Sequence, residues 1–109
     1  MRTDFSSLCD IGCADGSLTV KTADLLGIPL ENTYGVDIRD FGEKPFNFLQ
    51  ADFEIQPIPL PDNSIDLVTV TQVLHHVHQY VKLIREITRI LRPGGILIVR
   101  ESLLLDQTN

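Results

Sequence analysis

A chain of 109 residues has room for one small domain and no more. Hydrophobic residues make up 43% of the sequence, within the ordinary range for a domain with a buried core. The formal charge of −6 argues against autonomous binding to DNA or RNA, because that binding requires a basic surface.

The sequence has no apolar run near the length of about 18 residues that a membrane-spanning helix requires. Residues 1–5 also lack the apolar stretch of a signal peptide. Cys9 and Cys13 are therefore interpreted as reduced thiols, and we expect a cytoplasmic protein without a membrane partner.

The first half of the chain predicts three strands and one helix. Residues 8–11 are typical of a short buried strand, and residues 17–26 predict a helix that Gly27 closes at its carboxyl end. Residues 33–38 and 46–50 predict the second and third strands. Only about seven residues separate those two strands, fewer than the 10–12 of an ordinary parallel crossover, so we expect no helix between them.

The second half predicts a proline-rich connection, two strands and a helix. Three prolines in residues 57–61 exclude a central strand or a helix interior there. Residues 65–70 predict a fully buried strand, residues 79–91 a helix that residues 93–95 terminate, and residues 96–99 the fifth strand. The residues expected on the buried face of that helix are Tyr80, Ile84, Ile87 and Leu91. This order of elements indicates a mostly parallel sheet.

The strongest functional signal is residues 10–16, Asp-Ile-Gly-Cys-Ala-Asp-Gly, between the first strand and the first helix. Glycine there lets the backbone approach a ligand without an intervening Cβ. The helix behind it offers free N–H groups and a positive dipole end to a carboxylate. A dinucleotide fingerprint would need a glycine where Ser17 stands. The alternative is a tight turn that binds no ligand.

The pattern Gly-x-Ala-x-Gly, with Asp10 in front, resembles the first motif of the class I methyltransferases that use S-adenosylmethionine (SAM). Ala14 departs from the middle glycine of that motif but is still small. Residues 60–68, 71–76 and 89–95 resemble further family segments, in the right order and spacing. The type 11 branch, which acts on small molecules, shares these features most closely.

The resemblance implies a three-layer, Rossmann-like α/β domain over residues 1–109, with strand order 3-2-1-4-5 and without the family's C-terminal hairpin. It also implies a SAM site, with S-adenosylhomocysteine (SAH) as product. In that site Asp37, about 20 residues past the glycine loop, would hold the ribose hydroxyls. Asp52 and Phe53 would recognise adenine, and Ile38 would pack on its face. The implied cofactor-binding residues are Asp10, Gly12, Cys13, Ala14, Gly16, Asp37, Ile38, Asp52, Phe53 and Thr71.

Each polar residue of this set has a second interpretation. Asp10 could accept backbone N–H groups in the turn, Asp37 could be a solvated strand end, and Asp52 could form a turn. His75 is the candidate catalytic residue, as a general base on the acceptor side. Together with His76 it could equally belong to a polar loop, because methyl transfer often needs only proximity and alignment. We expect no metal site, since Cys-x-x-x-Cys is not the usual zinc spacing.

We therefore expect methyl transfer from SAM to an acceptor that the sequence does not name, a small molecule in this branch. Three alternatives are a catalytically inactive SAM-binding or scaffold domain, an RNA or cap methyltransferase core within a larger assembly, and a nicotinamide-dependent oxidoreductase. The chain has no Asn-Pro-Pro-Tyr motif of amide-nitrogen methylation. A Lys-Asp-Lys-Glu tetrad of ribose methylation is not convincingly placed either.

Two helices have to cover five strands that are apolar on both faces. Residues 96–99 would leave an exposed apolar edge, and Leu103, Leu104 and Leu105 would add to it. We therefore expect a fragment of a longer chain whose remainder covers this surface, or else a second copy of the chain.

Overall fold

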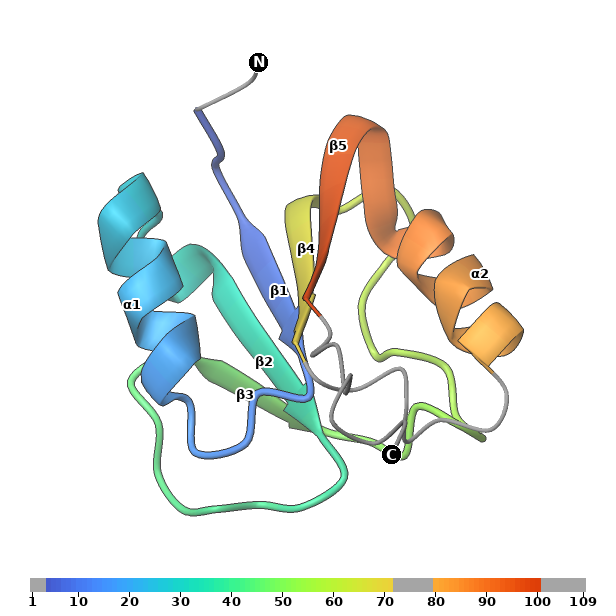
Figure 1. Cartoon of the computed structure of the whole chain (residues 1–109), viewed down its shortest axis with the longest axis horizontal. Helices are drawn as coiled ribbons and strands as arrows, with labels where there is room; N and C mark the ends of the chain where they lie inside the picture. The colour runs from blue at the N-terminus through green and yellow to red at the C-terminus, as the bar shows by residue number, and fades with distance from the viewer. Residues whose placement is uncertain (1–3, 72–79, 101–109) are drawn as a thin grey trace, which may run out of the picture.

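The computed structural model of the chain describes residues 4–71 and 80–100, in which a five-stranded sheet has one helix on each face (Figure 1). In chain order the elements are β1 (Leu8–Ile11), α1 (Ser17–Leu26), the short 3-10 helix η1 (Leu30–Asn32), β2 (Thr33–Asp37), β3 (Asn47–Gln50), β4 (Ile65–Thr71), α2 (Tyr80–Ile90) and β5 (Leu91–Arg100).

All five strands are parallel and lie in the order β3-β2-β1-β4-β5, which confirms the predicted topology. In the centre of the sheet Ile11 pairs with Val36 on one side and with Val70 on the other. The carboxyl ends of β1, β2 and β4 therefore lie at the same edge of the sheet. Strand β1 has β2 on one side and β4 on the other, so the strand order reverses between β1 and β4. The carboxyl edge at such a reversal is where these folds generally bind nucleotides.

Helix α1 has the predicted bounds because a glycine stands at each end. Gly16 before it and Gly27 after it both have left-handed backbone angles, with φ of 87° and 68°. The N–H of Gly27 donates to the carbonyl oxygens of Ala23 and Asp24, which closes the last turn. The buried side of α1 packs on one face of the sheet, in a cluster with Leu8, Ala23, Ile28 and Leu67.

The buried face of α2 matches the predicted one in part, because Ile87 is buried and Ile84 packs against the same core cluster. Leu83, Ile87 and Ile90 are buried, whereas Tyr80 is 56% exposed. Leu83 and Ile90, which were not predicted, also follow helical spacing, and only packing against the sheet shows that they are buried. Leu91, the fourth residue of the predicted face, lies in β5 rather than in the helix.

Strand β5 is longer than the predicted residues 96–99. It starts at Leu91, directly after α2, where Leu91 pairs with Ile65, and Pro93 disfavours helical geometry at Arg92. Leu91 pairs with Ile65 and Ile96 pairs with Leu67, so the residues between them form an irregular bulge. Gly94 supports this bulge with a φ of 83°. The Pro-Gly-Gly segment therefore shapes a strand as well as ending a helix.

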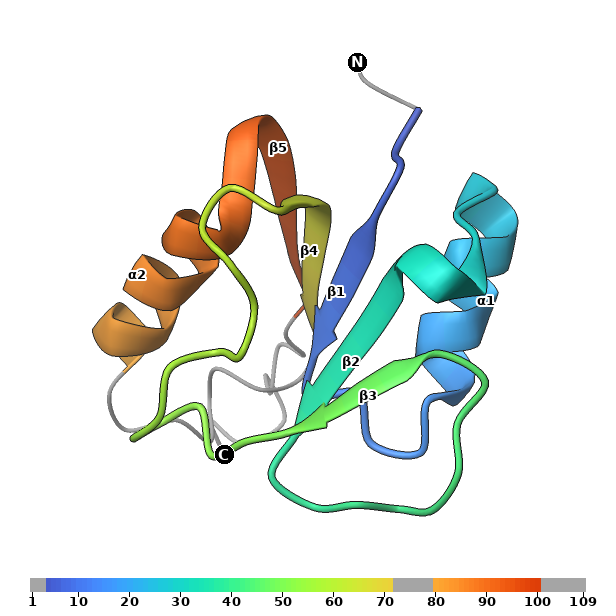
Figure 2. The same ribbon diagram turned by 180° about the vertical axis from the view of Figure 1, so that it is seen from behind.

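The expectation that two helices alone cover the sheet is wrong for one face. There, the connection of residues 51–64 lies beside α2, as both views show (Figure 2). Its Ile58 is 1% exposed, and Phe53 and Leu60 pack against the same core cluster. At the sheet edge, Ile96 and Ile98 of β5 are each 36% exposed. In residues 4–71 and 80–100, no helix is long and apolar enough to cross a membrane.

Candidate cofactor-binding site

The loop after β1 turns sharply at the carboxyl edge of the sheet. The N–H groups of Gly12 and Cys13 both donate to the carbonyl oxygen of Val36 in β2, at 2.7 and 3.2 Å. Three residues of the loop have positive φ, namely Gly12 at 76°, Ala14 at 51° and Gly16 at 87°. An alanine in this region costs roughly 1–2 kcal/mol. Ala14 therefore keeps a glycine-like backbone at the position where the family motif has glycine.

Asp37, at the end of β2, holds this loop from the neighbouring strand. Its Oδ2 accepts a hydrogen bond from the N–H of Ala14 at 2.9 Å, and its Oδ1 accepts one from the N–H of Arg39 at 3.2 Å. A carboxylate offers about four acceptor positions, so these two bonds leave capacity for further donors. The structure thus brings together two residues that the sequence assigned to different parts of one ligand.

Asp10, at the other end of the same motif, is buried and is 4% exposed. Its Oδ2 accepts from the hydroxyl of Thr19 in α1 at 2.6 Å, and its Oδ1 accepts from the hydroxyl of Thr69 in β4 at 3.0 Å. Burial raises the pKa of Asp10, and the two hydroxyl bonds oppose that rise. In place of the turn N–H groups considered from the sequence, Asp10 joins β1 to α1 and β4.

Thr19 and Thr69 were missed by sequence reasoning. Each is a polar residue at a buried position, Thr19 on the inner side of α1 and Thr69 within the apolar run of β4. A threonine at such a position is unremarkable by itself. The available signal was that two such threonines flank a buried strand that ends in an acidic residue.

Beneath the loop, the side chain of Cys13 is buried against the α1 side of the sheet. A Cβ at Gly35 would lie 2.8 Å from its Sγ and 2.6 Å from the ring of Phe46. A Cβ at Gly16 would lie 2.7 Å from the same ring. Burial raises the pKa of Cys13 to about 12, so its thiol is neutral at physiological pH. Phe46, predicted as a strand residue, instead packs under the glycine loop just before β3.

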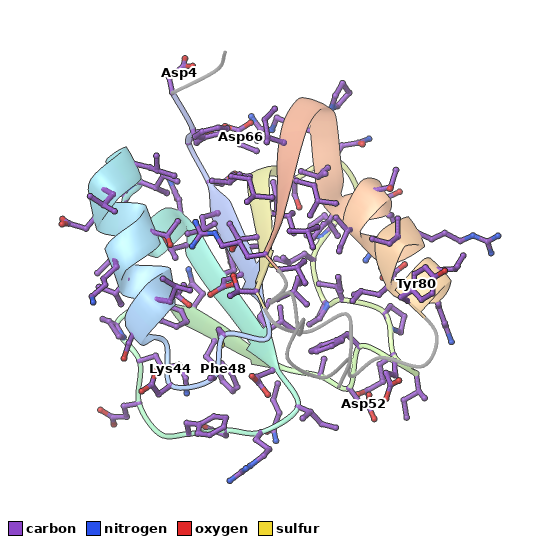
Figure 3. The ribbon with its side chains drawn as sticks, in the orientation of Figure 1. Asp4, Lys44, Phe48, Asp52, Asp66 and Tyr80 are labelled. Atoms are coloured by element: carbon purple, nitrogen blue, oxygen red, sulfur yellow. The ribbon has the colours of Figure 1, made fainter. Side chains whose placement is uncertain are left out.

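The loop of residues 38–46 takes the place of a crossover helix. The side chain of Lys44 is 1% exposed, and its ammonium lies 4.0 Å from the centroid of the Phe48 ring. This ammonium also donates to the carbonyl oxygen of Gly42 at 2.7 Å and lies 3.5 Å from Asp40 Oδ1. Figure 3 shows Lys44 and Phe48 near the first turn of α1. These contacts hold the loop of residues 38–46 in place.

Asp52 follows β3 and lies at the same end of the sheet (Figure 3). The N–H of Ala51 donates to the carbonyl oxygen of Asp37 at 3.0 Å, which places Asp52 beside the end of β2. Its Oδ1 accepts from the N–H of Glu54 at 3.1 Å, and its own N–H donates to Gln56 Oε1 at 2.7 Å. Asp52 is therefore a turn-forming residue, and its carboxylate retains acceptor capacity.

The remaining predicted residues divide into two groups. Ile38 is 51% exposed beside Asp37, Phe53 is partly buried after Asp52, and Thr71 is the last residue of β4. His75 and His76 lie outside the residues that the structure describes.

A hollow of about 310 Å³ lies at the opposite, amino end of the strands, away from the glycine loop. It is lined by Ser6, Ser7, Asn32, Tyr34, Leu60, Pro61, Ser64, Ile65 and Arg92. In open parallel α/β sheets ligands generally bind outside the carboxyl ends of the strands, which is the end opposite this hollow.

The fold and the loops define a Rossmann-like α/β domain with a glycine-rich turn after β1 and an acidic residue at the end of β2. Residues 9–99 match the Methyltransf_11 family, described as a methyltransferase domain. The chain belongs to this family of SAM-dependent methyltransferases, which confirms the resemblance inferred from the sequence.

Two relatives illustrate the match. The chain is 34% identical over 110 residues to the ubiquinone/menaquinone biosynthesis C-methyltransferase UbiE of Hahella chejuensis, covering 88% of this chain and 43% of that protein. It is 29% identical over 103 residues to the demethylmenaquinone methyltransferase of Geobacillus stearothermophilus, covering 85% of this chain and 44% of that protein. The chain thus spans less than half the length of these relatives.

The same fold occurs in the solved structure of SpnF, described as a cyclase. It superposes with a TM-score of 0.73 at 27% identity, and the match covers 90% of this chain and 39% of that chain. The same fold therefore also occurs in a protein that is named as a cyclase.

Proposed function

We propose that this chain binds SAM at the carboxyl edge of its sheet and serves methyl transfer to a small-molecule acceptor. The observation that carries the proposal is the hydrogen bond between Asp37 and the N–H of Ala14. It joins the acidic end of β2 to the glycine-rich turn, so that both line one place at the sheet edge. When bound, SAM would supply a methyl group activated by its sulfonium.

The residues present fit such a nucleoside. A carboxylate at Asp37 can accept from both ribose hydroxyls and repels a 2′-phosphate, which disfavours the phosphorylated nicotinamide cofactor. Asp52 would accept from the exocyclic amine of adenine, and the exposed side chain of Ile38 would cover the face of the base. The backbone contact between Ala51 and Asp37 supports this arrangement because it keeps the two carboxylates on neighbouring segments.

The methionyl part would lie over the turn of residues 12–16. Positive φ at Gly12, Ala14 and Gly16 gives this turn its sharp path, and the small side chains leave room for the ligand. Cys13 would contribute through its backbone, because its thiol is buried beside Gly35. Asp10 would act through the positions of α1 and β4, to which its carboxylate is bonded.

His75, four positions after Thr71 in the sequence, remains our proposal for the general base on the acceptor side. We expect His75→Ala to leave SAH affinity nearly unchanged and to lower turnover. Equilibrium titration with SAH and a turnover assay separate the two effects. Loss of SAH binding in a folded His75→Ala variant would show that the acceptor side is misplaced, and unchanged turnover would favour the polar-loop interpretation.

The names of the quinone-methylating relatives support a small-molecule acceptor, and the charge of −6 weighs against an RNA substrate. SAM binding without methyl transfer is the second candidate, because SpnF is described as a cyclase. We further propose that residues 1–109 form one cofactor-binding core. We also propose that further chain or a second copy of this chain covers the apolar edge at β5.

The test is a thermal-shift panel of SAM, SAH and NAD, followed by transfer of a labelled methyl group to demethylated quinones. Ligand that binds only the folded chain raises its midpoint of unfolding. We expect SAM and SAH to raise the midpoint and NAD to leave it unchanged. A shift with NAD alone would overturn the cofactor assignment, whereas SAM binding without transfer to any acceptor would favour the second candidate.

A further inference from the structure

The connection between β3 and β4 crosses a face of the sheet without a helix or strand of its own. Such a segment needs partners for its buried backbone groups, because unpaired polar groups are costly away from water. Residues 51–64 include the turn at Asp52 and the three prolines that exclude regular structure. Side chains of α2 form hydrogen bonds with several backbone groups of this segment.

Arg89 is the centre of these contacts. Its Nη2 donates to the carbonyl oxygen of Ile58 at 2.8 Å, and its Nη1 donates to that of Leu60 at 2.8 Å and to Asp62 Oδ1 at 2.9 Å. Its Nη2 and Nε also donate to the two oxygens of Glu86, at 2.9 and 3.0 Å. These bonds use all five N–H donors of a guanidinium.

Glu86 completes the arrangement from one turn earlier in α2. Its Oε1 accepts the N–H of Ile58 at 2.8 Å as well as the guanidinium of Arg89. Both backbone polar groups of Ile58 are therefore held by the same pair of side chains. A lysine at position 89 would not reproduce this, because an ammonium lacks the planar fork of donors.

Ile58 is connected closely to the turn that carries Asp52. The N–H of Gln56 donates to the carbonyl oxygen of Asp52 at 2.8 Å, and the Gln56 side chain accepts the N–H of Asp52. Pro57 joins this closed turn to Ile58 and has a restricted φ. A shift of Ile58 would therefore be transmitted to Asp52 over a short and stiff segment.

We propose that Arg89, together with Glu86, is a positioning residue for recognition of the nucleoside base. By fixing Ile58 and Leu60 it holds the 52–56 turn where the Asp52 carboxylate can accept from an exocyclic amine. Arg89 itself does not contact the ligand. The inference rests on the proposed function, because it requires that Asp52 face the adenine of SAM.

The test compares SAH with S-inosylhomocysteine, in which a carbonyl replaces the exocyclic amine, by calorimetry on the complete chain. We expect the wild type to prefer SAH by roughly tenfold or more, as one lost hydrogen bond to a carboxylate implies. Arg89→Ala should bring this ratio close to one and change affinity for the inosine compound less than threefold, on the order of the scatter between matched variants. Asp52→Ala should lower the ratio in the same way.

Arg85→Ala is the matched control, because Arg85 is an exposed cation on the same helix. It should keep the wild-type ratio. Should Arg89→Ala fail to fold, Glu86→Gln carries the same comparison, since it keeps an acceptor for Ile58 and weakens the guanidinium contact. An unchanged ratio in a folded Arg89 or Glu86 variant, or an equal loss of both affinities, would overturn the inference alone. A wild-type chain that binds neither compound would overturn the proposed function as well.

Discussion

The carboxylate of Asp37 and the backbone N–H of Ala14 are joined by a hydrogen bond of 2.9 Å, across 23 positions of sequence. Ala14 has a φ of 51°, which an alanine rarely adopts. The residue proposed to bind ribose therefore also supports the strained turn proposed to bind the methionyl group. A change at Asp37 should affect both parts of the ligand.

We predict that Asp37→Ala weakens SAH binding by about 1.5–3 kcal/mol, the range for hydrogen bonds to a charged group. Asp40→Ala should have a smaller effect, because Asp40 is exposed and its contacts are within its own loop. Isothermal titration of both variants provides the comparison. Equal losses from the two substitutions would show that the ribose is placed wrongly.

Asp10 gives a prediction about stability. Asp10→Ala removes the acceptor of two buried hydroxyls and should lower the free energy of unfolding by about 2–4 kcal/mol. Asp10→Asn should stay within about 1 kcal/mol of the wild type, because an amide pairs with both hydroxyls and no longer buries a charge. Urea denaturation measures both.

The matched comparison for Asp10 is Asp24→Ala, at an exposed position of α1. It should leave the unfolding midpoint nearly unchanged. If Asp10→Asn destabilised the chain as much as Asp10→Ala, the negative charge itself would be required. The joint role of Thr19 and Thr69 would then need another explanation.

Hydrophobic runs and turn residues predicted most of the fold. The bounds of β1 and α1, and the strand order, follow from a buried apolar run, the flanking glycines and the parallel topology. The buried face of α2 followed only in part, because Leu83 and Ile90 are buried beside the predicted Ile87 and only the sheet shows this. The early start of β5 depends on pairing with Ile65, which is distant in sequence.

The positions of candidate site residues were predictable where those residues belong to a local sequence motif. Gly12, Ala14 and Asp37 could be placed at one edge because they follow parallel strands. The contacts around them were not predictable, since Phe46 and Thr69 are unremarkable in sequence. Phe46 reaches the space beside Gly16, and Thr69 reaches Asp10, only through the fold. Arg89 was assigned to a family segment without any expectation of its contacts with Ile58 and Leu60.

Packing under the loop predicts a clash at Gly35. Gly35→Ala would place a Cβ 2.6 Å from the Phe46 ring and 2.8 Å from Cys13 Sγ. We expect a loss of about 1–3 kcal/mol in the free energy of unfolding, as for other overpacked cores. Adding Phe46→Ala should recover part of that loss, and a double-mutant cycle by denaturation measures it. Strictly additive effects would contradict the packing described.

Glu86 predicts a pH dependence of stability. The hydrogen bond from Arg89 lowers the pKa of Glu86 below its ordinary value of 4.5. Its contribution is therefore complete above pH 4.5 and is lost as pH falls through the lower pKa of the folded state. Unfolding midpoints measured from neutral to acid pH should fall less steeply for Glu86→Gln than for the wild type. Parallel curves would show that the Glu86–Arg89 pair does not set this dependence.

A crystal structure of the chain with SAH bound tests the central claim most directly. We predict the ribose hydroxyls within hydrogen-bond distance of Asp37, the adenine beside Asp52 and Ile38, and the methionyl group over residues 12–16. SAH at the amino ends of the strands, in the hollow between Ser6 and Arg92, would contradict the account. So would SAH at the carboxyl edge with no contact to Asp37.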